Sequence, residues 1–166
     1  MSYKITIKSI LKSLQFDIVV ILLMLVILYI YNFESTYCQV FFWFYIITSS
    51  FGYWLLFEYF YLNYGKEYYF ESDKLFIKTI RNGVIEEYNF DLIRKIYLCR
   101  SMSIESNGIK FSSMEGYYFY KIDFKDNRVV YLTSVLSPSI FNLHTKFKGK
   151  EIIRKRSPFC SFLVYS

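Results

Sequence analysis

The residues that could carry catalysis are few and scattered. The single histidine, His144, falls among apolar residues at helical spacing. We therefore expect it to be packed or exposed on a helix and not to be catalytic. Glu86 and Glu87 are adjacent in a strand-like run and therefore face opposite sides, which prevents them from acting as a pair on one substrate. Asp123 and Asp126 flank a predicted turn, where aspartate is frequent for backbone reasons. We find no nucleotide-binding glycine pattern, nucleophile motif or metal-ligand spacing, and predict a non-enzymatic protein without catalytic residues, cofactor, metal or small-molecule substrate.

The cysteines and the net charge point to no further chemistry. Cys38, Cys99 and Cys160 are odd in number, far apart and in no CxxC pattern, so neither a metal site nor a disulfide is predicted. The net charge of +6 is typical of cytoplasmic loops beside anionic lipid. No nucleic-acid motif accompanies this charge, so nucleic-acid binding is not predicted.

A basic segment near the C-terminus is the first candidate contact surface. Its cationic residues lie within eleven positions and are Lys146, Lys148, Lys150, Arg154, Lys155 and Arg156. Apolar and aromatic residues follow from 158 to 165. This combination suits contact with the inner leaflet of a membrane, where each basic residue contributes about 1 kcal/mol. A solvated tail whose end packs on the domain is the alternative, and the sequence leaves both open.

A second candidate surface is the aromatic-rich strand from 117 to 124. Tyr117, Phe119 and Lys121 alternate along it and are our candidate residues for binding a partner protein. Exposed sheet edges are suited to the addition of a partner's strand. The same pattern is equally consistent with a core strand.

Two apolar runs of the sequence are predicted to hold these two candidate surfaces at a membrane. They extend from 16 to 31 and from 39 to 57, and a bilayer core of about 30 Å requires about 20 apolar helical residues. We therefore predict a transmembrane helical hairpin over 16–62, after a cytoplasmic segment 1–15. No small-residue cleavage site follows the first run, which argues against a signal peptide. Two buried core helices of a soluble protein are the remaining alternative.

The distribution of basic residues predicts the orientation of the hairpin. The loop between the runs has no Lys or Arg, whereas basic residues flank both outer ends: Lys4, Lys8, Lys12, Lys66, Lys74, Lys78 and Arg81. By the positive-inside rule both termini face the cytoplasm. The chain has no alanine and is rich in Phe, Tyr, Ile, Lys and Asn, which have AT-rich codons. We therefore expect a multi-pass protein of a bacterial inner membrane.

Two carboxylates interrupt the apolar runs. Carboxylates inside membrane spans can form a proton or ion pathway, but Asp17 and Glu58 lie near the cytoplasmic ends of the spans. We therefore expect both at the interface, with Asp17 near Lys12 or water and Glu58 near Lys66.

From residue 67 the pattern changes to short strand-like runs separated by turn signals. Asn82-Gly83 is the strongest signal, because both residues tolerate the positive φ of a tight hairpin. The predicted strands cover 68–71, 74–81, 84–90, 95–99, 109–111, 117–124 and 128–133. Ser137-Pro138 then begins an amphipathic helix that ends at Gly149. The predicted class is α+β, with a domain over 67–149 and a basic-apolar tail over 150–166.

The segment 68–96, YYFESDKLFIKTIRNGVIEEYNFDLIRKI, resembles small bacterial membrane proteins that have two spans and a PH-like domain. The matching features are Ser72-Asp73-Lys74-Leu75, Asn82-Gly83 and the stretch 92–96. The resemblance implies an antiparallel β-barrel or sandwich of about seven strands with a C-terminal helix. It carries no ligand and no catalytic residue, since fold does not fix function.

These observations predict a membrane-anchored module that binds lipid and a partner protein or a second copy of the chain. Two other classes stay open. One is an immunity protein against a membrane-targeted toxin, and the other is a membrane-associated enzyme or transporter component. The latter needs polar residues within the spans, where Thr48, Ser49, Ser50 and Gly52 also suit close helix packing.

Overall fold

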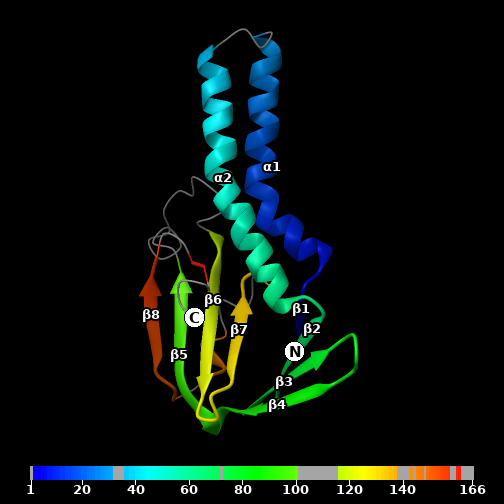
Figure 1. Cartoon of the computed structure of the whole chain (residues 1–166), viewed down its shortest axis with the longest axis vertical. Coiled ribbons are helices and arrows are strands. Elements are labelled where there is room, and N and C mark those ends of the chain that lie inside the picture. Colours follow the sequence, from blue (N-terminus) through cyan, green and yellow to red (C-terminus); the bar gives the residue numbers. More distant parts are fainter. Residues whose placement is uncertain are drawn as a thin grey trace.

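The computed structural model describes residues 2–31, 36–71, 73–100, 116–137, 143, 145–147, 149–157 and 160–161. Within them, two long helices, α1 (Ile7–Ile30) and α2 (Thr36–Asn63), extend from a β-rich domain (Figure 1). The strands are β1 (Ser2–Lys4), β2 (Lys66–Glu71), β3 (Lys74–Thr79), β4 (Ile85–Asn89), β5 (Ile93–Arg100), β6 (Tyr118–Phe124), β7 (Val129–Thr133) and β8 (Ile152–Arg156). A 3-10 turn, η1 (Phe90–Leu92), separates β4 from β5.

The helices form the expected hairpin, and both are long and apolar enough to cross a bilayer. Helix α1 begins at a capping box, in which Thr6 and Ser9 each accept the other's backbone N–H through their side-chain oxygens. Most apolar side chains of the hairpin are exposed; Leu23 is 58% and Phe41 is 67% exposed. Helices that are apolar all round and left uncovered by the rest of the described chain are suited to a membrane or to another protein surface, which disfavours the alternative of two core helices of this domain.

The strands form two four-stranded sheets that enclose the main core. The first has the order β1-β2-β3-β4 and is antiparallel throughout. The second has the order β7-β6-β5-β8, in which β8 pairs in parallel with β5. The main core consists of inward-facing residues of both sheets, among them Leu75, Ile96, Tyr120, Ile122 and Leu132.

The α+β class is confirmed, and strands β2 to β7 correspond to six predicted strands. The seventh, 109–111, and most of the predicted helix over 137–149 lie outside the described residues, although Leu143 and Phe147 are buried in the main core. Two strands were not predicted. β1 lies in the segment before the hairpin, and β8 lies in the segment 150–166, so the sheet extends beyond the predicted domain end at 149.

A second core joins the hairpin to the domain. We call it the junction cluster, and its buried residues are Leu55, Tyr59, Cys99, Tyr117, Phe119, Val135 and Cys160. The ring of Tyr59 packs edge-on against Tyr117 and Phe119, at centroid distances of 5.4 and 6.1 Å. Its hydroxyl donates to the carbonyl of Cys160 at 2.6 Å. One turn later, Asn63 Nδ2 donates to Thr133 Oγ1 of β7 at 3.1 Å. Helix α2 is therefore part of the domain as well as of the hairpin.

Truncation of Leu55 to alanine tests this shared core. Leu55 is fully buried in the junction cluster, and a buried Leu→Ala change costs about 2–5 kcal/mol. We expect Leu55→Ala to lower the midpoint of thermal unfolding in detergent and to expose the α2–domain connection to protease. Leu22→Ala, the same change at a 57% exposed hairpin position, is the control and should leave both readouts near wild type. Equal behaviour of the two variants would contradict a shared core.

Candidate functional site

The predicted partner-binding strand, β6, is largely interior. Tyr117 and Phe119 are 2% and 1% exposed, because α2 covers this end of the sheet. This corrects the expectation of an open aromatic surface and favours the core alternative for both residues. Burial raises the pKa of the Tyr117 hydroxyl, and the nearby charge of Asp17 adds to the effect. Of the three candidate residues on this strand, Lys121 alone is partly exposed.

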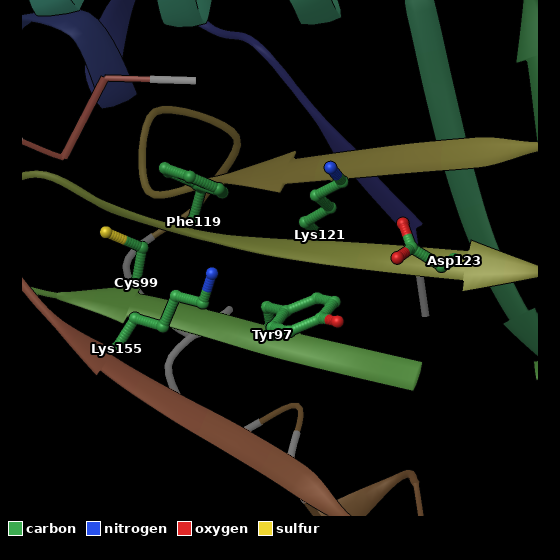
Figure 2. A pocket seen from close by; sticks show the side chains of 6 residues that line it. All are labelled: Tyr97, Cys99, Phe119, Lys121, Asp123 and Lys155. Carbon is green, nitrogen blue, oxygen red and sulfur yellow. The ribbon is translucent and has the colours of Figure 1, made fainter. Parts of the chain in front are cut away.

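Lys121 instead lines a small pocket on the outer face of the second sheet, beside the junction cluster. The pocket has a volume of about 110 Å³ and is lined by Tyr97, Cys99, Phe119, Lys121, Asp123 and Lys155. Figure 2 shows Lys121 of β6 and Lys155 of β8 on either side of Tyr97 of β5. The structure thus brings together one residue from each of the two surfaces predicted from sequence.

Two ammonium groups and one carboxylate line this pocket. The Lys155 ammonium lies 4.9 Å from the centroid of the Tyr97 ring, and the Lys121 ammonium lies 6.0 Å from that of Tyr131. Asp123 lies at the far end of the pocket (Figure 2). Its Oδ1 is buried and has no hydrogen-bond partner among the described residues. Two ammonium groups beside one carboxylate can receive a carboxylate side chain of a partner.

The predicted basic surface is divided by the fold. Arg154, Lys155 and Arg156 lie in β8, where successive side chains face opposite sides of the sheet. Lys155 shares the outer face with Tyr97, so Arg154 and Arg156 are directed to the other face. β8 runs toward the hairpin (Figure 1), and Lys150 therefore lies at the end remote from it.

The remaining predicted basic residues do not form one continuous surface with those of β8. Lys146 is described and exposed, in the turn that precedes β8, whereas Lys148 lies outside the described residues. The described basic residues are therefore spread along the length and over both faces of an edge strand. A continuous contact of this segment with one membrane surface is not favoured by that arrangement.

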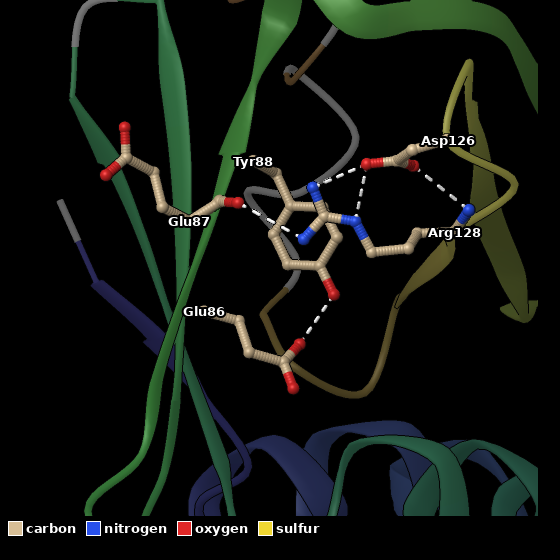
Figure 3. A network of polar contacts seen from close by, with 5 residues as sticks. All are labelled: Glu86, Glu87, Tyr88, Asp126 and Arg128. Atoms are coloured by element: carbon tan, nitrogen blue, oxygen red, sulfur yellow. Dashed lines mark hydrogen bonds and ion pairs between the residues drawn. The ribbon is translucent and has the colours of Figure 1, made fainter.

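A separate polar network joins the two sheets at the end remote from the hairpin (Figure 3). Arg128 forms an ion pair with Asp126, and its Nη1 donates to the carbonyl of Glu87 in β4 at 3.3 Å. Its guanidinium lies 4.3 Å from the ring centroid of Tyr88. The hydrogen bond from the Arg128 side chain holds the pKa of Asp126 below its usual value. The network fixes the β6–β7 turn against β4, so its role is architectural.

The two glutamates of β4 have separate partners, as predicted for adjacent strand residues. Glu86 accepts a hydrogen bond from the Tyr88 hydroxyl at 2.6 Å, whereas Glu87 pairs with Lys74. Burial, with the Glu86 hydrogen bond, raises the pKa of Tyr88 to about 12. Neither glutamate is placed to act with the other on a substrate.

The two carboxylates of the hairpin are buried, and the expected partners were wrong for both: Asp17 contacts neither Lys12 nor the exposed surface, and Glu58 does not pair with Lys66. Asp17 is 1% exposed and accepts a hydrogen bond from the Tyr45 hydroxyl at 2.7 Å. Glu58 is 4% exposed and its Oε1 accepts from Trp54 Nε1 and from Ser161 Oγ, both at 2.8 Å. These bonds tie α1 to α2 and α2 to the C-terminal segment. The ammonium of Lys66 donates instead to the carbonyl of Leu62 at 3.0 Å.

Two of the three cysteines meet in the junction cluster, although 61 residues separate them in the chain. The sulfurs of Cys99 and Cys160 are 3.1 Å apart and both residues are 1% exposed. Both are free thiols. The hydrogen bond with Cys99, together with burial, raises the pKa of Cys160. The spacing of the cysteines in the sequence does not predict this contact, because it depends on where Cys160 lies relative to β5 and α2.

The comparisons with known proteins add no relative: no protein-family model, curated protein or solved structure matches this chain. The resemblance to bacterial proteins with a PH-like domain therefore stays a prediction based on turn motifs.

The thiol pair gives a test of the junction. Burial leaves both thiols inaccessible, and the raised pKa of Cys160 lowers its thiolate fraction further, so Cys99 and Cys160 should react with a maleimide at neutral pH at least about 100-fold more slowly than Cys38. Cys38 is partly exposed in the first turn of α2. Peptide mass spectrometry of the labelled full chain measures all three rates, and labelling after denaturation is the control for intrinsic reactivity. Equal rates at the three cysteines in the folded protein would contradict the buried junction.

Proposed function

We propose that this chain is a membrane-anchored, non-enzymatic interaction module of a bacterial inner membrane. In this proposal the hairpin spans the bilayer, and the β-rich domain binds a partner protein on the cytoplasmic side. The observation that carries the proposal is the junction cluster. Because α2 belongs to the core of the domain, the hairpin fixes the orientation of the domain against the membrane instead of serving as a flexible tether.

The orientation in this proposal is supported by the position of the charges. Lys4, Lys8 and Lys12 lie at the start of the hairpin, and Lys66 follows its second helix. All four are at the domain end of the two helices. The positive-inside rule assigns that end to the cytoplasm, so the domain and both termini are cytoplasmic in this proposal.

The proposal also interprets the domain as PH-like. It is supported by the chain order, in which three consecutive antiparallel strands, β2 to β4, precede the next three described strands, β5 to β7, in a second sheet. The predicted helix over 137–149 is assigned the role of closing one end, where Leu143 and Phe147 already enter the main core. Strands β1 and β8 are not part of this PH-like arrangement and extend its two sheets.

The partner surface in this proposal is β8 together with the pocket of Lys121 and Lys155. β8 is an edge strand of the second sheet among the described elements, and an edge can pair with an extended segment of another protein. Its basic side chains and the two ammonium groups of the pocket favour an acidic segment. The partner is therefore a protein that presents an extended, acidic stretch.

Cysteine accessibility tests the orientation. In a Cys38→Ser background, Thr36→Cys places a thiol at the loop end of the hairpin and Lys125→Cys places one on the domain, both at exposed positions. We expect an impermeant maleimide to label Thr36→Cys in right-side-out vesicles and Lys125→Cys in inside-out vesicles. The Cys38→Ser parent, in which Cys99 and Cys160 are buried, is the blank. Labelling of both sites from one side would contradict a spanning hairpin, and the reverse pattern would contradict the orientation.

Charge reversal tests the partner surface. We expect Lys121→Glu with Lys155→Glu to remove proteins that co-purify with the full chain in mild detergent, because an acidic segment is then repelled. The matched control is Arg94→Glu with Lys95→Glu, two exposed positions at the start of β5. Thermal unfolding verifies that both variants fold. Retention of the same partner by the pocket variant, or recovery of wild type alone, would contradict this surface.

A further inference from the structure

A cavity lies where the hairpin meets the first sheet. Its volume is about 470 Å³, and it is bordered by the β1–α1 connection, the C-terminal turn of α2 and the end of β3. Three basic residues, Lys4, Lys66 and Arg81, line it together with apolar residues that include Ile10, Phe60 and Ile80.

A second, apolar groove adjoins this cavity on the hairpin. It has a volume of about 230 Å³ and is lined by Ile10, Tyr53, Leu56, Phe57 and Phe60. Ile10 and Phe60 line both spaces. The basic cavity and the apolar groove therefore adjoin at these two side chains.

We propose that this composite site binds one anionic phospholipid of the cytoplasmic leaflet. The phosphate lies against Lys66 and Arg81, and an acyl chain lies along Ile10, Phe57 and Phe60. The inference rests on the proposed insertion of the hairpin into a bilayer, and it names a ligand for a part of the protein remote from the proposed partner surface.

The charges at the mouth favour an anion. Lys4 pairs with Glu67 at 3.7 Å, whereas Lys66 and Arg81 have no ion pair within the described part of the chain and supply the positive charge of the mouth. Lys66 uses one ammonium hydrogen on the carbonyl of Leu62, and an ammonium has two more to donate. Thr6, the N-cap of α1, lines the same cavity, which adds the positive end of a helix dipole.

The apolar surroundings favour a lipid over a soluble phosphate compound. Ile7 is 79%, Tyr64 is 68% and Phe57 is 63% exposed around the mouth and the groove. A soluble anion would leave this apolar surface uncovered, whereas an acyl chain covers it at about 25 cal/mol per Å². The position at the domain end of the hairpin also matches the depth at which a phosphate group of the cytoplasmic leaflet would lie.

The backbone supports an open mouth at this point. The chain reverses from α2 into β2 at Gly65, whose φ is +70°, a conformation that side chains rarely adopt. The Gly65 carbonyl accepts a hydrogen bond from the N–H of Ile80 at 2.7 Å. This bond holds Ile80 and Arg81 beside the end of α2, so the basic and apolar groups of the site come from elements that are fixed relative to one another.

Lipid retention by the full chain tests the proposal. The protein is exchanged into nanodiscs of phosphatidylcholine and phosphatidylglycerol, released, and examined by native mass spectrometry. We expect wild type to retain one phosphatidylglycerol, and Lys66→Gln with Arg81→Gln to lower the retained fraction roughly 10-fold or more. Lys95→Gln with Lys125→Gln, the same charge change at exposed domain positions, should retain lipid as wild type does. Equal retention by both variants, or no preference for the anionic lipid, would overturn the site.

Two further arms separate the sources of failure. Glycerol phosphate offered without acyl chains should not displace the lipid, and equal binding of this headgroup would assign the site to free phosphate instead. Alkaline carbonate extraction reports on the hairpin alone. A chain that stays in the membrane without retained lipid would overturn only this inference, whereas a chain that is extracted would overturn both this inference and the proposed membrane anchor.

Discussion

The fixed attachment of the hairpin to the domain depends above all on the burial of Tyr59. Its ring is fully buried between α2 and the second sheet, in edge-on contact with Tyr117 and Phe119. A buried hydroxyl requires a partner, and the carbonyl of Cys160 supplies it at 2.6 Å. This one side chain therefore connects the helix, the sheet and the C-terminal segment. The orientation of every outer surface relative to the hairpin follows from that connection.

The buried carboxylates also help to fix the position of the hairpin relative to the domain. Asp17 and Glu58 each receive hydrogen bonds from partners on other turns or other elements, Tyr45 for the first and Trp54 and Ser161 for the second. An apolar helix pair in an apolar medium has little preference for one rotation over another, since the medium is as apolar as the helix surface. Polar contacts supply that preference. These carboxylates thus specify how α1, α2 and the C-terminal segment fit together.

Local signals in the sequence were sufficient for the helices and for β2 to β7, because apolar runs and turns such as Asn82-Gly83 are local properties. They were insufficient for β1 and β8. These strands are short and partly basic, and they exist because they pair with β2 and β5. The pocket of Lys121 and Lys155 depends on the β8 pairing, so no spacing rule could find it. The aromatic strand at Tyr117 was ambiguous for a related reason, since only the docking of α2 distinguishes core from surface.

Helix α2 connects the two regions that we propose as functional. Phe60 lines the cavity beside the first sheet, and the adjacent Tyr59 packs against the second sheet. A lipid that binds the folded arrangement and not an undocked one stabilises the docked state by RT ln(1 + [L]/Kd). In a membrane rich in anionic lipid, the effective lipid concentration is high, so this contribution is maintained. Taken together, the two proposals predict that the lipid composition of the bilayer favours the orientation in which β8 and its pocket are presented, without any contact between the lipid and the partner.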